Sequence, residues 1–136
     1  MNSKLYIVRG IPGSGKSTFA KKMISKKMAD AYYEADMFFE RNGKYQFDPS
    51  KLRQAHEWCQ NQVMKALSEG KTVIVSNTFT RIPEMLPYVN FCKKNHIPFQ
   101  VIRLTTNFGS IHNVPADSIE RMKNRFQDWR GEILIK

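Results

Sequence analysis

The 136 residues are enough for one domain with its own hydrophobic core and too few for a second. Lysine and arginine total 22 against 12 acidic residues, a net charge of +10. Such a charge attracts polyanions such as nucleic acid, or it belongs to a basic surface that aids solubility. Because the basic residues are spread along the chain, they indicate a folded basic surface and not a basic tail.

Cysteine usage and hydropathy exclude several classes of protein. Cys59 and Cys92 have no metal-ligand spacing and are expected to be reduced, buried thiols. No stretch approaches the ~18 apolar residues of a membrane helix. A glycine-rich motif within ten residues of the start leaves no room for a signal peptide, so we expect a soluble, cytoplasmic protein without a membrane partner.

The expected elements alternate between strand and helix along the chain. A short apolar strand precedes the glycine-rich motif, and a helix opens at Lys16. Asn42-Gly43 predicts a loop or small hairpin within 37–47, and Asp48-Pro49 predicts a helix start. The expected strands are 5–8, 31–33, 71–76 and 99–104. The expected helices begin at Lys16, Asp48, Thr80–Pro83 and Pro115, and Gly70, Asn95 and Gly131 mark the ends of the last three.

This alternation predicts an α/β domain over residues 1–136, with a four- or five-stranded, mainly parallel sheet and helices on both faces. Residues 133–135 form either the fifth strand or simply the end of the chain. Ligands of such sheets bind beyond the carboxyl ends of the strands. The loops 10–17, 34–47, 76–81 and 105–114 are therefore the places expected to carry chemistry.

The dominant motif runs from Gly10 to Ser17 and has the form G-x-x-x-x-G-K-[ST], that of a nucleotide phosphate-binding loop. Glycines allow backbone N–H groups to close around an anion. The Lys16 amine can reach the β- and γ-phosphates, and the Ser17 hydroxyl is placed to ligate Mg²⁺. The predicted phosphate-binding residues are Gly13, Ser14, Gly15, Lys16 and Ser17.

Other polar side chains follow the remaining expected strands. Asp36 is a general base, a ligand of a Mg²⁺-bound water, or merely a capping or surface loop residue. Ser76 and Asn77 lie where phosphate-loop proteins usually carry a metal-binding carboxylate. They either hydrogen-bond a water of the metal shell or a substrate oxygen, or cap the strand. Arg81 could pair with a substrate phosphate through its guanidinium fork.

Three further arginines are weaker candidates, for which a surface role is the alternative: Arg103, Arg121 and Arg125. His112 could reach a bound phosphate or base, or merely cap the last helix. Aromatic residues between 38 and 47 are mixed with Arg41 and Lys44. These rings could stack on nucleic acid bases or pack against the domain.

The sequence resembles the small P-loop kinases related to the 5′-kinase domain of bacteriophage polynucleotide kinase, which include "AAA" domains of phages and bacteria. The resemblance covers nearly the whole chain. The matching blocks are Gly10–Thr18, Ala35–Phe39, Gly43–Asp48, Ala55–Trp58, Asn77–Thr80 and His112–Pro115. It implies a three-layer P-loop NTPase fold and transfer of the γ-phosphate of ATP, with Mg²⁺, to a 5′-hydroxyl. It also places Thr18 beside the α-phosphate.

The chain departs from the family in two places. The phage kinases have two adjacent aspartates where this sequence has Ala35-Asp36, and their lid arginine has no counterpart in residues 108–112. We therefore carry three hypotheses: a 5′-hydroxyl polynucleotide kinase-like enzyme, a kinase of a nucleoside or metabolite, and a low-turnover ATP-binding module for nucleic acid or a protein. In the enzyme readings, Lys16, Asp36 and Arg81 are the catalytic residues, and Ser17 and Asp36 the metal residues.

Overall fold

The computed structural model describes residues 3–41, 43–105 and 116–135. Its main sheet contains β1 (Lys4–Arg9), β2 (Ala31–Tyr33), β5 (Thr72–Asn77), β6 (Phe99–Leu104) and β7 (Ile133–Ile135). The strand order is β2-β5-β1-β6-β7, and every neighbouring pair is parallel. The predicted α/β class is confirmed, and residues 133–135 supply the fifth strand.

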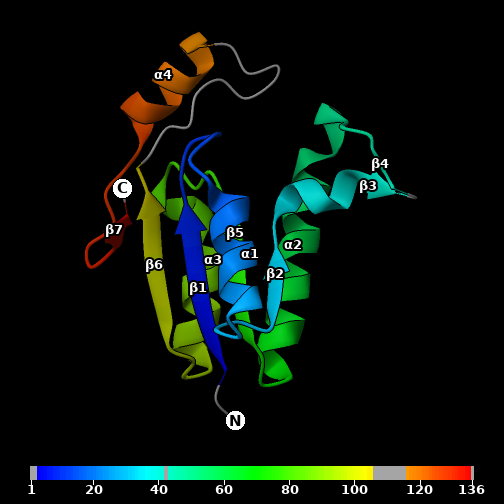
Figure 1. The fold of residues 1–136 in the computed structure, drawn as a ribbon, viewed down its shortest axis with the longest axis vertical. Helices are drawn as coiled ribbons and strands as arrows, with labels where there is room; N and C mark the ends of the chain where they lie inside the picture. The colour runs from blue at the N-terminus through cyan, green and yellow to red at the C-terminus, as the bar shows by residue number, and fades with distance from the viewer. Residues whose placement is uncertain (1–2, 42, 106–115, 136) are drawn as a thin grey trace.

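Helices cover both faces of this sheet (Figure 1). The covering helices are α1 (Lys16–Ser25), α2 (Leu52–Ser68) and α3 (Ile82–Lys94), and the fourth α-helix that the structure describes is α4 (Ala116–Arg125). Side chains alternate along β1, so Leu5 and Ile7 pack in the core formed with α2 and α3, whereas Val8 packs in the core formed with α1. Each core is closed by apolar residues at helical spacing, which explains the three-layer arrangement.

A small subdomain follows β2. It consists of the 3-10 helix η1 (Ala35–Phe39), the antiparallel pair β3 (Glu40–Arg41) and β4 (Lys44–Tyr45), and the 3-10 helix η2 (Pro49–Lys51). The hairpin predicted around Asn42-Gly43 is thus present. The Asp48 carboxylate accepts a hydrogen bond from the Ser50 amide at 3.0 Å, so the predicted capping residue starts η2, which leads directly into α2.

The last helix is shorter than its apolar spacing predicts. The sequence predicts a helix up to Gly131, but α4 ends at Arg125. Beyond that point the backbone bonds to the rest of the domain, because the Gln127 amide donates to the Thr80 carbonyl at 2.8 Å. Tertiary contacts therefore replace the expected last turn.

The carboxyl ends of the strands meet at one edge, where the connection from β1 to α1 and the start of η1 both lie (Figure 1). Helix α4 lies beyond this edge, above β6. Of the four loops expected to carry chemistry, three are at this edge, and the fourth falls mostly outside the described residues. Across the described part of the chain, no helix is long and apolar enough to cross a membrane.

Candidate functional site

The loop between β1 and α1 has the backbone that an anion-binding loop requires. Gly13 and Gly15 have φ angles of 87° and 89°, in the left-handed region that favours glycine. The Gly15 carbonyl accepts the Phe19 amide at 2.9 Å, so α1 begins directly after the loop and points its N-terminus toward it. Ser14 is 3 % exposed, and among the described residues its Oγ has no hydrogen-bond partner. A nucleotide phosphate fits this unused buried donor.

Lys16 lies over the same loop. Its Nζ donates to the carbonyls of Gly10 at 2.8 Å and Ile11 at 3.1 Å. Burial lowers the pKa of the Lys16 amine to about 8, against the opposing effect of the Glu34 and Asp36 carboxylates. The predicted lysine is therefore partly desolvated, close to two carboxylates, and held by carbonyls that a phosphate can replace.

A hydroxyl and carboxylate network connects the loop to the ends of β2 and β5. The Tyr32 hydroxyl donates to the Glu34 carboxylate and lies 3.5 Å from Ser17 Oγ and 3.3 Å from Ser76 Oγ. Ser76 Oγ also donates to Glu34 at 3.4 Å. Burial, followed by the bond to Glu34, raises the pKa of Tyr32 to about 12, so the phenol stays protonated as a donor. Ser76 thus bonds within the domain.

Glu34 is the functional candidate that sequence reasoning missed. The sequence has no carboxylate at the end of β5, but β2 is its neighbour in the sheet, and Glu34 follows β2 directly. The structure therefore brings a carboxylate to Ser76 from the next strand. Its position directly after a strand was the available signal, because polar residues there meet at the carboxyl edge of the sheet.

Asp36 is exposed in the first turn of η1. Its Oδ1 accepts a hydrogen bond from the Tyr45 hydroxyl at 3.4 Å. The start of η1 is fixed by Asn77, whose Oδ1 accepts the Ala35 amide at 3.0 Å. Asn77 therefore acts on the backbone that carries Asp36.

The remaining candidates differ in how they are held. Arg81 is exposed just before α3, where its backbone amide donates to the Glu84 carboxylate at 3.3 Å and its carbonyl accepts the Glu84 amide at 3.1 Å. Arg103 instead pairs with Asp128 at 2.7 Å, within the domain. Arg121 and Arg125 are exposed on α4. His112 and the segment compared with the family's lid lie outside the described residues.

The side chains present suit a Mg²⁺ that is bound together with a nucleotide. Within residues 3–41, 43–105 and 116–135, no group of three acidic, histidine or cysteine side chains could hold a metal ion alone. Mg²⁺ usually keeps several waters and needs one or two protein oxygens plus substrate phosphates. The Ser17 hydroxyl and the carboxylates of Glu34 and Asp36 provide such oxygens beside the loop.

Comparisons with known proteins identify the class of this domain. The profile of an AAA domain family matches residues 5–113. Human NEDD4-binding protein 2 is 33% identical over 143 residues, covering 96% of this chain and 8% of that protein. The "Putative bifunctional polynucleotide phosphatase/kinase" of Acanthamoeba polyphaga mimivirus is 28% identical over 93 residues, covering 68% of this chain and 18% of that protein.

A solved structure shows the same fold. A chain in the Pnkp1/Rnl/Hen1 RNA repair complex superposes with a TM-score of 0.72 at 20% identity, covering 91% of this chain and 44% of that one. The chain belongs to the AAA domain family of P-loop kinases, as its resemblance to the polynucleotide kinase group predicts. It spans only a small part of the two relatives named above, 8% of one and 18% of the other.

Proposed function

We propose that this domain is an ATP- and Mg²⁺-dependent phosphotransferase that phosphorylates the 5′-hydroxyl end of a nucleic acid. The observation that carries the proposal is the placement of Lys16 and its phosphate loop against the carboxylates of Glu34 and Asp36 at one edge of the sheet. A cation for the phosphates and a base for the acceptor are the two parts that phosphoryl transfer to a hydroxyl needs.

Each side chain has a definite role in this reaction. Lys16 leaves the loop carbonyls and binds the β- and γ-phosphates, while Ser14 and the loop amides hold the same group. Mg²⁺, when bound, would neutralise charge on the phosphates, and the Ser17 hydroxyl would hold it directly, while Asp36 and Glu34 would hold it through bound waters. The acceptor oxygen bonds to the γ-phosphorus as the bond to the β-phosphate oxygen breaks, and ADP leaves. Asp36 accepts the hydroxyl proton.

Charge and family support a nucleic acid as the acceptor. The net charge of +10 favours a polyanion. The relatives include proteins named for polynucleotide phosphatase/kinase activity and for an RNA repair complex. Exposed Arg81, which follows β5 at the same edge, is proposed to bind an acceptor phosphate.

The test is transfer of labelled γ-phosphate from ATP to a 5′-hydroxyl oligonucleotide by the wild type and Lys16→Ala. We expect label on the oligonucleotide with wild type and a loss of at least a hundredfold in the variant, because the γ-phosphate loses its cation. Preferential labelling of a mononucleoside would support a small-molecule kinase instead. ATP binding without labelling of any acceptor would support a low-turnover binding module.

A further inference from the structure

Two exposed aromatic rings beside Asp36 have no part in the core or in the reaction described above. Tyr45 is 54% exposed and Phe47 is 49% exposed, whereas Phe39 beneath them is only 4% exposed. The Tyr45 and Phe47 rings are nearly parallel, with 16° between their planes and 6.5 Å between their centroids. We call these two side chains the aromatic platform.

The local sequence builds this platform. In an extended chain, alternate side chains share a face, so Tyr45 and Phe47 lie together while Gln46 points away. The Gln46 amide donates to the Phe39 carbonyl at 2.9 Å, which fixes the pairing beyond β4. Phe39 meets both rings edge to face, with centroids 5.1 Å from Phe47 and 6.3 Å from Tyr45. The exposed rings are therefore supported from the buried core.

The aromatic platform is hydrogen-bonded to Asp36, the proposed general base. The Tyr45 hydroxyl donates to Asp36 Oδ1 at 3.4 Å, so Asp36 lies at the hydroxyl end of one platform ring. In a nucleoside, one ribose separates the base from the 5′-hydroxyl. A base stacked on the platform can therefore place its own 5′-hydroxyl near the Asp36 carboxylate.

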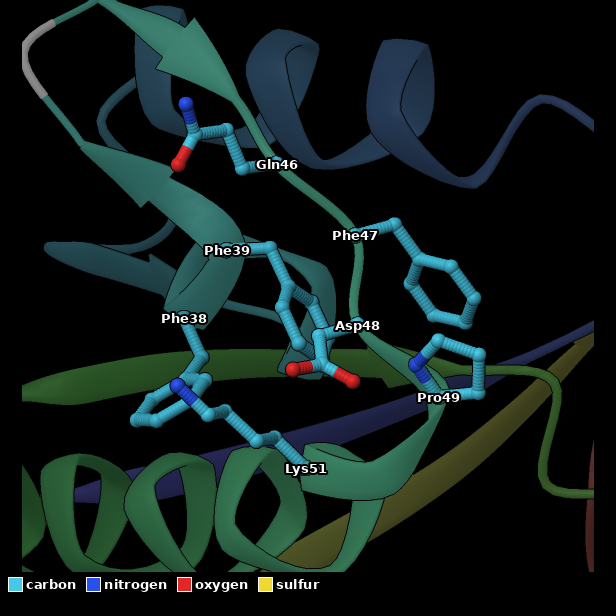
Figure 2. Close-up of a pocket in the computed structure, with 7 residues that line it drawn as sticks. All are labelled: Phe38, Phe39, Gln46, Phe47, Asp48, Pro49 and Lys51. Carbon is cyan, nitrogen blue, oxygen red and sulfur yellow. The ribbon is translucent and has the colours of Figure 1, made fainter.

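A hollow of about 300 Å³ adjoins Phe47 (Figure 2). Its lining residues come from η1, from the segment after β4 and from η2: Phe38, Phe39, Gln46, Phe47, Asp48, Pro49 and Lys51. Such a volume is at the lower end of the range for small-molecule sites. Lys51 at the hollow and exposed Lys44 beside Tyr45 provide positive charge for a nucleic acid backbone.

We propose that the aromatic platform binds the terminal nucleobase of the 5′-hydroxyl acceptor by stacking, and so selects a base-bearing end. This inference rests on the proposed function and names the part of the acceptor that the site reads. Stacking tolerates any base, because every base has a π-face. Recognition would thus depend on the presence of the terminal base and not on its identity.

The test compares two single-stranded 5′-hydroxyl oligonucleotides that differ only in having a normal or an abasic 5′-terminal residue. Binding is followed by fluorescence anisotropy of a 3′ label, so it requires no catalysis. We expect wild type to bind the normal end about tenfold more tightly, and Phe47→Leu to remove that difference. Phe47→Trp keeps a stacking ring and is expected to keep the preference.

Met28→Ala is the matched control, because Met28 is also 54% exposed and lies outside the site. It is expected to behave as wild type, and circular dichroism checks that all variants fold. Equal binding of the two oligonucleotides by wild type, or a preference retained in Phe47→Leu, would overturn the inference. Phosphorylation of both oligonucleotides with equal kcat/KM would overturn it too, while leaving the kinase intact. A preference for the normal end without any phosphorylation would support stacking on the aromatic platform and overturn the proposed kinase activity.

Discussion

Lys16 is a base whose pKa of about 8 is well below its ordinary value of 10.5, because burial disfavours the charged form. Binding of nucleotide phosphates requires the charged form and raises this pKa. Proton uptake therefore accompanies nucleotide binding when the pH is near or above the ligand-free pKa of Lys16. Below that pH the amine is already charged and binding takes up no proton at this group.

We therefore predict that nucleotide affinity falls as pH rises from about 7.5 to 9.5, approaching tenfold per pH unit above the Lys16 pKa. Isothermal titration calorimetry in two buffers of different ionisation enthalpy measures the proton uptake, expected to be about half a proton at pH 8. Lys16→Ala should bind weakly, with little uptake over this range. Equal uptake in the variant and wild type would show that another group titrates.

The residues that a local motif determines could be predicted from sequence. Lys16 and Ser17 follow from the spacing of the loop, since its backbone geometry fixes where both side chains point. Glu34 could not be assigned in the same way, because its partner Ser76 comes from a strand 42 residues away. Predicting the contact between Glu34 and Ser76 requires the order of the strands in the sheet, which residue spacing does not give.

At the scale of elements, η1 carries Asp36 but is held at its start from β5. The Asn77 side chain is half-buried, and its Oδ1 accepts a hydrogen bond from the Ala35 amide at 3.0 Å.

 Without that bond, the first amide of η1 would be left unpaired inside the domain. Asn77 is therefore a positioning residue for Asp36.

We predict that Asn77→Ala lowers the free energy of unfolding by about 1–3 kcal/mol, the cost of an unpaired buried polar group. It should also lower kcat for phosphoryl transfer with little change in nucleotide affinity, because η1 moves while the phosphate loop stays in place. Asn90→Ala, on the exposed face of α3, is the control. Unchanged stability and kcat in Asn77→Ala would contradict a positioning role.

Most element boundaries follow from local sequence signals, but the C-terminal end of α4 does not. Asp48-Pro49 and Gly70 mark the limits of η2 and α2 because capping and left-handed glycine geometry are local effects. The end of α4 is different. Phe126 continues the apolar spacing of the helix, but it packs between Arg9 and Arg103, whose guanidinium carbons lie 4.4 Å and 4.3 Å from the ring centroid. No local pattern predicts such a contact.

At the scale of the whole molecule, the segment after α4 is tied to the strand ends by a buried ion pair. Arg9 is 0% exposed and donates to Glu132 Oε1 at 3.0 Å. Its Nε also donates to the Phe79 carbonyl at 3.0 Å, where the backbone has a φ of 47°. Because Arg9 immediately precedes Gly10, this contact joins the C-terminal segment to the start of the phosphate loop.

We predict that Glu132→Gln lowers the free energy of unfolding by about 3 kcal/mol, because it leaves a buried guanidinium without its carboxylate. Urea denaturation measures the change. Glu57→Gln is the matched control, since the Arg53–Glu57 pair is 93% and 60% exposed and should contribute almost nothing. Equal changes in the two variants would show that the buried pair does not hold the segment in place.

The most direct test of the proposed function is the single-turnover rate of γ-phosphate transfer from ATP to a 5′-hydroxyl oligonucleotide, in wild type and Asp36→Asn. The proposed mechanism predicts transfer by wild type and a rate at least a hundredfold lower in the variant, with nucleotide affinity nearly unchanged, because the amide cannot accept the hydroxyl proton. Equal rates in the two proteins would contradict the role of Asp36. No transfer by wild type, with ATP bound, would contradict the proposed kinase activity itself.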